Sequence, residues 1–246
     1  MFRISISPEE IGRLELASFP GEIVVIDSLG EAFGAAIRYL KQQRVLGFDT
    51  ETRPTFSPDQ RSNGTALLQL SGGGKAFLFR LKKIGLPRRL AAILANPNIV
   101  KVGAATKDDV RGLQQISRFC PQNFVDLQNI VWEYGIRDKS VKKMAAIILD
   151  VKISKAQQLS NWEADTLSES QRRYAATDAW VCREMYQRLL LADISRIKPQ
   201  VLTLVLLLDE RLDDIGVMHA GSCGVVLLDE LCLLVGLDVV LVAIVV

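Results

Sequence analysis

Two acidic residues stand at the end of a predicted strand, where they could bind a cation. Residues 44–49 are predicted to form a strand that leads into Asp49 and Glu51, which are two positions apart. Along an extended chain this spacing places both side chains on one face of the sheet. Neighbouring carboxylates repel each other unless a cation neutralises them. A strand that ends in solvent would explain the same residues, so D-x-E alone leaves a metal site and a surface turn as alternatives.

A second acidic pair opens a predicted helix. The apolar stretch 99–102 is predicted to form a strand that Gly103 follows, and Asp108 and Asp109 lie in the first turn of a helix predicted over 107–116. The helix dipole favours acidic residues at this position, which is one explanation. The other is a functional site, because α/β sheets bind their ligands at the carboxyl ends of strands.

A tyrosine and an aspartate share one face of a third predicted element. Tyr174 and Asp178 are four residues apart in a helix that is predicted to begin near Glu169. Ser168 and Gln171 match the capping-box pattern that starts such a helix. The alanines between Tyr174 and Asp178 would let the helix approach another element closely. Taken alone, the pair favours a surface aspartate beneath a half-buried tyrosine over a functional pair.

The chain of 246 residues contains one histidine, His219, which excludes several classes of chemistry from residues 1–200. Serine–histidine–aspartate and cysteine–histidine hydrolases and histidine-ligated zinc sites cannot be built there. Carboxylate oxygens without histidine or cysteine suit Mg²⁺ or Mn²⁺. Two such ions about 3.5–4 Å apart can clamp the attacking and leaving oxygens of a phosphodiester. The carboxylates therefore indicate two-metal phosphodiester chemistry.

The order of these motifs resembles a known family. D-x-E, then G-x5-D at a helix start, then Y-x3-D within a helix is similar to the tyrosine subgroup (DEDDy) of the DEDD 3'-5' exonucleases. The surrounding segments VLGFDTETRPTF, ALLQL, IVKVGAATKDDVRGL and LSNWEADTLSESQRRYAATDAW resemble ribonuclease D-like proteins and the exonuclease domain of Werner-syndrome-type helicases. The resemblance covers roughly residues 22–191.

The resemblance implies an α/β fold of the ribonuclease H-like (DnaQ-like exonuclease) type, with a mixed β-sheet flanked by α-helices. It also implies two bound ions, Mg²⁺ or Mn²⁺. Asp49 and Asp178 would hold the ion that activates water, with Glu51 as a further ligand, and Asp49 would bridge to the second ion. Asp109, six residues after the glycine, would reach that second ion, and its neighbour Asp108 stays open as the alternative.

The implied activity is release of nucleoside monophosphates from the 3' end of a nucleic acid. Tyr174 would orient the attacking water. A phenol with a pKa near 10 is better suited to positioning water than to deprotonating it. The alternative hypothesis is a non-catalytic or weakly active nucleic-acid-binding protein on the same fold.

The elements that must position these residues are read from apolar periodicity and from turn residues. SGGGK lacks the spacing of a phosphate-binding loop and is predicted to be a hairpin turn between two strands. The predicted strands are 22–26, 44–49, 66–70, 76–79, 99–102 and 124–127; the predicted helices are 29–43, 87–95, 107–116, one from 128, 140–149 and one from 169 towards 191.

The near-neutral total charge of +2 hides two unlike parts. Residues 1–200 carry a net charge of +8, and the remaining residues carry −6. We therefore divide the chain into a lead-in over 1–21, an exonuclease domain over 22–195 and an atypical apolar and acidic tail over 196–246. Acidic residues interrupt each apolar run of the tail, so no membrane span is expected.

The basic body predicts a polyanionic partner, namely single-stranded nucleic acid or 3' ends, with DNA and RNA equally open. No protein partner can be inferred. Sparse cysteines and the lack of a secretory pattern favour a cytoplasmic protein. Several residues could contact nucleic acid or could simply lie on solvated faces or in the core; these are Lys101, Lys107, Arg111, Arg172, Arg173, Trp162 and Phe56.

Overall fold

A computed structural model describes residues 2–54 and 64–213, with side chains described up to residue 192. The chain divides into two compact units, Met1–Ile194 and Ser195–Val246. The predicted tail begins within helix α8 (Glu169–Asp213), and its residues 214–246 lie outside the described part. Within the described residues, none of the helices combines the length and the apolar character that crossing a membrane requires.

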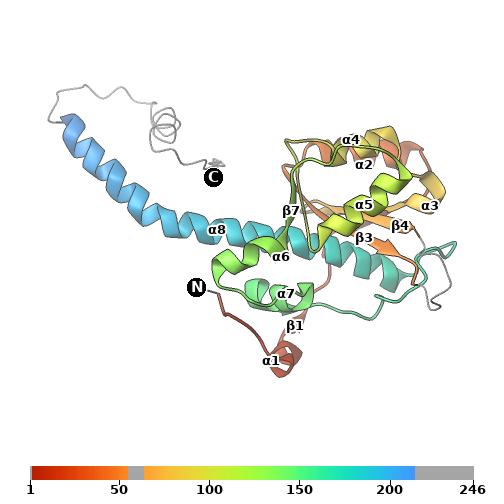
Figure 1. Cartoon of the computed structure of the whole chain (residues 1–246), viewed down its shortest axis with the longest axis horizontal. Coiled ribbons are helices and arrows are strands. Elements are labelled where there is room, and N and C mark those ends of the chain that lie inside the picture. The colour runs from red at the N-terminus through yellow and green to blue at the C-terminus, as the bar shows by residue number, and fades with distance from the viewer. Residues whose placement is uncertain (1, 55–63, 214–246) are drawn as a thin grey trace. The chain divides into compact units, whose positions relative to one another are not determined.

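The first unit is built on a six-stranded mixed sheet (Figure 1). The strand order is β2-β5-β4-β3-β6-β7, in which β3 pairs antiparallel with β4 and parallel with β6. These strands are β2 (Glu22–Ile26), β3 (Val45–Thr52), β4 (Thr65–Ser71), β5 (Lys75–Arg80), β6 (Val100–Gly103) and β7 (Phe124–Asp126). β3 is therefore a central strand, and its end is surrounded by other elements.

Helices cover the sheet on both faces. Alternate residues of β3, β4 and β5 pack against the apolar sides of α2 (Glu31–Lys41), α4 (Arg88–Leu94) and α5 (Thr106–Ile116). The other face of β4 and β5 packs against α8, whose Ala175 and Ala176 are fully buried. This arrangement confirms the predicted mixed sheet flanked by helices.

Shorter elements complete the unit. α7 packs with α6, η1 and the middle of α8 in a separate apolar cluster that includes Met144, Val181 and Met185. β1 pairs parallel with β8 in a small second sheet. The bounds of these elements are α1 (Pro8–Arg13), β1 (Glu15–Leu16), α3 (Leu81–Ile84), α6 (Leu127–Ile130), η1 (Val131–Tyr134), α7 (Val141–Leu149) and β8 (Val151–Lys152).

The strands and most of the longer helices lie where the periodicity predicted them, with ends that shift by a few residues. The exception is α8, which continues to Asp213, well past the end predicted near Leu191. The SGGGK turn joins β4 and β5, with the Gly72 amide donating to the Lys75 carbonyl at 2.9 Å. The capping box is also confirmed: the Ser168 amide donates to the Gln171 side chain, and the Gln171 amide donates to the Ser168 hydroxyl. The short elements α1, β1, α3 and β8 were not predicted, because two to six residues carry too little periodicity.

A glycine permits the closest approach between β3 and α8. A Cβ built on Gly47 would lie 1.8 Å from the carbonyl oxygen of Ala179, a backbone atom that cannot move aside. Gly47 precedes Asp49 by two residues, and Ala179 follows Asp178 directly. The distance between the two acidic residues therefore depends on this glycine.

We expect Gly47→Ala to lower the melting temperature and to separate the acidic residues. Overpacking of this kind costs about 1–3 kcal/mol, which corresponds to roughly 3–10 °C for a domain of this size. The matched control is Gly34→Ala inside α2, where the new Cβ would meet only the Arg38 guanidinium at 3.5 Å. Thermal unfolding followed by circular dichroism checks this, and equal melting temperatures for the two variants would contradict it.

Candidate metal centre and active site

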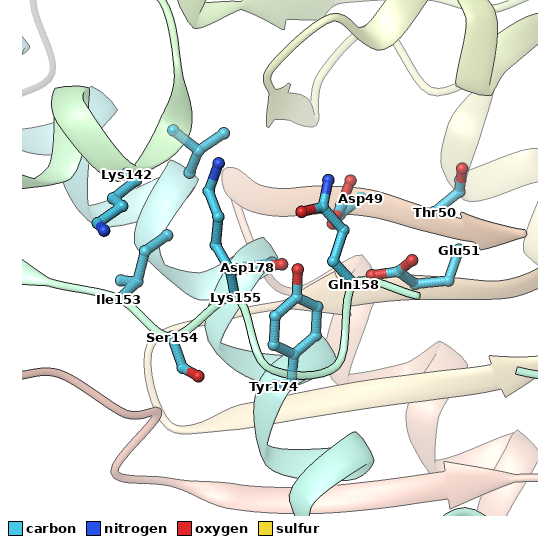
Figure 2. A pocket seen from close by; sticks show the side chains of 11 residues that line it. Asp49, Thr50, Glu51, Lys142, Ile153, Ser154, Lys155, Gln158, Tyr174 and Asp178 are labelled. Atoms are coloured by element: carbon cyan, nitrogen blue, oxygen red, sulfur yellow. The ribbon is translucent and has the colours of Figure 1, made fainter. Parts of the chain in front are cut away.

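Three predicted carboxylates meet at one point. Asp49 and Glu51 lie on β3 and Asp178 lies on α8, and one carboxylate oxygen from each lies within 4.8 Å of the others. Figure 2 shows Asp49 and Glu51 along one strand, with Asp178 approaching from the helix beside them. The side chains are partly buried. The structure thus brings together three of the four predicted metal ligands.

Local structure explains why these three side chains converge. The i, i+2 spacing places Asp49 and Glu51 on the sheet face that α8 covers, because alternate residues of a strand face the same side. The β3–β4 register shifts between Glu51 and Thr52, so regular pairing ends directly after the second carboxylate. Small residues on α8 then allow Asp178 to come close to β3.

Burial and, for Asp49 and Glu51, neighbouring negative charges raise the pKa values of the three acids. Burial, followed by the charges of Asp178 and Asp109, raises the pKa of Glu51 to about 9. Burial raises the pKa of Asp178 to about 7, although a hydrogen bond from Tyr174 opposes the rise. Burial and the neighbouring Asp178 and Glu51 also raise the pKa of Asp49. A cluster that is costly to ionise by itself is one that a divalent cation would stabilise.

Asp109 lies close to the three acids without joining them. The Thr50 hydroxyl donates to its carboxylate at 2.5 Å, across the side of β3 that faces α5. Burial raises the pKa of Asp109 to about 6, and its charge contributes to the raised pKa values of Asp49 and Glu51.

Its neighbour Asp108 points elsewhere. The Asp108 side chain is 87% exposed and pairs with Arg111 at 3.1 Å within the same helix. Of the two aspartates that open α5, only Asp109 is electrostatically coupled to the acid cluster, so the geometry favours it as the second-motif residue.

Tyr174 lies one helical turn before Asp178 and hydrogen-bonds to its carboxylate. Burial and the surrounding negative charges hold the pKa of Tyr174 well above its ordinary value, so the phenol stays protonated. Its ring packs against the fully buried Trp162, with ring centroids 6.0 Å apart. The Gln171 side chain, besides capping the helix, donates to the Asn161 carbonyl at 3.2 Å. Trp162 thus contacts the Tyr174 ring, and Asp178 accepts a hydrogen bond from its hydroxyl.

The acids form one side of a pocket of about 250 Å³ whose other side carries basic residues. Lys142 comes from the first turn of α7, and Lys155 and Gln158 come from the loop after β8 (Figure 2). Sequence reasoning missed these three residues. They belong to none of the acidic motifs, and only the tertiary fold carries them to the cluster.

Other predicted contacts prove to be structural. Lys101 is fully buried, and its ammonium donates to the carbonyls of Asn96 and Ile99, so the phosphate-binding alternative is wrong for it. Burial lowers the pKa of Lys101 to about 8. Trp162 belongs to the core, as one of the two alternatives predicted.

Two of the predicted nucleic-acid contacts on the surface form ion pairs within their own helices. Arg111 pairs with Asp108, and Arg173 pairs with Glu169 at 2.9 Å on the exposed start of α8. Lys107 and Arg172 are exposed, as either predicted alternative allowed. Phe56 lies outside the described residues.

A mixed sheet flanked by helices, with acidic residues from β3 and α8 at one pocket, defines a ribonuclease H-like fold of the exonuclease type. The chain belongs to the 3'-5' exonuclease family, whose model matches residues 28–192. Exonuclease 3'-5' domain-containing protein 2 of Drosophila melanogaster is 34% identical over 150 residues, covering 59% of this chain and 25% of that protein.

Two further comparisons agree. Ribonuclease D of Gluconacetobacter diazotrophicus is 27% identical over 184 residues, covering 73% of this chain and 45% of that protein. The crystal structure of the Aedes aegypti Nibbler EXO domain superimposes with a TM-score of 0.64 at 21% identity, covering 77% of this chain and 99% of that domain. The chain spans about a quarter of the length of the fruit-fly relative. The predicted family and fold are thus confirmed, and the roles of single residues stay predictions.

We expect the metal-free protein to lose stability as pH rises. The pKa values of Asp109, Asp178 and Glu51 are raised to about 6, 7 and 9, so the folded chain binds more protons than the unfolded one. The contribution of these three groups to stability is fully present below about pH 4 and is lost as the pH passes through their raised values. Thermal unfolding in a chelator should show a fall of roughly 5 °C or more between pH 5.5 and 9.

Mn²⁺ should restore the melting temperature, with a larger increase at pH 8.5 than at pH 6, because the cation replaces protons on the same oxygens. Asp49→Asn should reduce both effects, whereas Asp108→Asn should reduce neither. A melting temperature that changes with neither pH nor Mn²⁺ would count against a cation site.

Proposed function

We propose that the chain is a metal-dependent 3'-5' exonuclease that hydrolyses the terminal phosphodiester of a nucleic acid and releases a nucleoside monophosphate. The observation that carries the proposal is the convergence of Asp49, Glu51 and Asp178 within 4.8 Å beside a pocket with basic residues on its other side. Membership of the 3'-5' exonuclease family supports the same reaction.

The donor set fits Mg²⁺ or Mn²⁺. All three clustered ligands are carboxylate oxygens, which these hard cations prefer. Asp49, Glu51 and Asp178 would hold one ion, and Asp109, together with Asp49, would hold a second. Divalent cations at such a site supply Lewis-acid stabilisation of the attacking and leaving oxygens.

The chain's own residues position the reactants. Tyr174 stays protonated because burial and nearby acids raise its pKa, so its hydroxyl holds and orients the attacking water rather than accepting a proton from it. Asp178 accepts a hydrogen bond from the same hydroxyl, which fixes the direction of the phenol. On the side of Asp109, the Thr50 hydroxyl orients the carboxylate.

Lys142 and Lys155 are proposed to bind the phosphate groups of the 3'-terminal nucleotides. Both line the pocket opposite the acids, and the charge of Lys155 reaches Asp178. An anionic backbone placed between cations and lysines would be neutralised from both sides. The proposed partner is therefore a 3' end of single-stranded nucleic acid, either DNA or RNA.

Asp49→Asn and Asp178→Asn are expected to abolish activity. Removing a direct ligand should reduce the rate by more than the roughly 10–100-fold that loss of an outer hydrogen-bond partner causes. Asp109→Asn should also reduce activity strongly, and Asp108→Asn, its exposed neighbour, should leave it near the wild-type rate.

Denaturing gels of 5'-labelled single-stranded DNA and RNA with Mg²⁺ or Mn²⁺ measure these rates as a ladder shortening from the 3' end. Binding of the strand with no metal-dependent shortening would instead favour the non-catalytic nucleic-acid-binding protein.

Tyr174→Phe is expected to lower kcat by roughly 100-fold with little change in KM or in Mn²⁺ affinity, because it removes only the hydroxyl that orients water. The ring contact with Trp162 is preserved, so the melting temperature should hold. Single-turnover kinetics separate this loss from weakened binding. A Tyr174→Phe enzyme as fast as wild type would remove the tyrosine from the mechanism.

A further inference from the structure

One buried amide next to the acid cluster has no hydrogen-bond partner. Gln69, in the middle of β4, is 0% exposed, and neither its amide nitrogen nor its amide oxygen is hydrogen-bonded within the described part of the chain. An unsatisfied buried amide destabilises a fold, so most buried polar groups have partners. Leucine or methionine here would continue the apolar pattern of ALLQL without that penalty.

The sheet register places Gln69 directly beside a proposed metal ligand. Gln69 is the cross-strand partner of Asp49 in the antiparallel β3–β4 pair, so the two side chains lie on the same face of the sheet. Directly opposite residues in such a pair have Cβ atoms about 4.5–5.5 Å apart. A glutamine side chain can span that gap directly or through one water molecule.

The face of the sheet that carries Gln69 has both apolar and polar neighbours. Leu78 is its partner on β5, and Leu67 lies two residues before it on β4. Both leucines are fully buried and share a cluster with Ala175 and Ala176 of α8. Two polar side chains on this face already donate to backbone carbonyls: Ser71 to Gly72, and Arg80 to Ala164 and Asp165. The carboxylate of Asp49, directly opposite, and that of Glu51, on the diagonal, are the acceptors that remain for the Gln69 amide.

Resting on the function proposed above, we infer that Gln69 is a positioning residue for the metal centre. Its amide N–H donates to the Asp49 carboxylate through a buried water and so fixes the oxygen that faces the cation. A carboxylate offers about four lone-pair positions, and a cation uses only part of them. Outer hydrogen bonds of this kind orient metal ligands and typically contribute 10–100-fold to metal affinity.

The test compares two methionine substitutions in the 246-residue chain. Gln69→Met keeps the length of the side chain and removes the amide. Leu67→Met is the matched control, since it alters the same face of the same strand opposite Glu51 and removes no polar group. Mn²⁺ affinity is measured by the loss of the free-ion signal in electron paramagnetic resonance, and the melting temperature is measured in a chelator.

We expect Gln69→Met to weaken Mn²⁺ binding by about 10–100-fold while its metal-free melting temperature stays level or rises by roughly 2–8 °C. Leu67→Met should change Mn²⁺ affinity less than about twofold. A purely structural glutamine would not show rising stability together with falling affinity. Gln69→Leu provides the same comparison should the methionine variant fail to fold.

Three results would overturn the inference. Mn²⁺ affinity of Gln69→Met within twofold of wild type would show that the amide does not act on the metal site. An equal loss in Leu67→Met would assign the effect to packing of β4. No Mn²⁺ binding by the wild-type chain, with Asp49→Asn indistinguishable from it, would remove the proposed metal-dependent function and the role of Gln69 with it. The first two results leave the proposed function standing.

Discussion

The packing of α8 against β3 is the contact on which the site depends. It brings Asp178 within 4.8 Å of Asp49 and Glu51, at a place where burial and like charge make ionisation costly. The fold holds these groups together only because stronger forces act around them. Apolar residues of β3, β4 and β5 are buried beneath α2, α4 and α5 on one face, and the alanine side of α8 packs on the other. The acids therefore sit in a frame that hydrophobic burial stabilises, and a cation would relieve their repulsion.

The same contact explains the small residues around it. Gly47 has no space for a Cβ against the Ala179 carbonyl, and Ala175 and Ala176 are buried against the sheet. Larger side chains at these positions would add apolar area but would move Asp178 away from β3. The glycine and the alanines at these positions therefore permit the short distance between Asp178 and the acids of β3. Stability given up for a functional geometry is common at active sites.

Much of this arrangement could be predicted from the sequence, and the reasons differ between residues. Asp49 and Glu51 share a face because strands alternate, and Tyr174 lies one turn from Asp178 because helices repeat every 3.6 residues; both rules are local.

Asp108 and Asp109 could not be separated by sequence, since both begin the same helix and only the fold shows which faces β3. Lys142, Lys155 and Gln69 carried no signal, because their relation to the acids comes from tertiary contacts and strand pairing. The burial of Lys101 could not be predicted either. A charged side chain is expected on the surface, but this ammonium lies in the interior because two backbone carbonyls accept its hydrogen bonds.

The two sides of the pocket are built from different kinds of structure. The acidic side chains Asp49, Glu51 and Asp178 come from a central strand and from a long helix packed on it, which are the elements that hold a side chain most accurately. The basic side comes from the first turn of α7 and from the loop after β8, where Lys142 and Lys155 end in long side chains. Metal ligands must be placed within a few tenths of an ångström, whereas a lysine can follow a phosphate over a wider range. For the function proposed above, a site divided in this way would hold cations firmly and would still accept successive nucleotides of varying base, as stepwise removal from a 3' end requires.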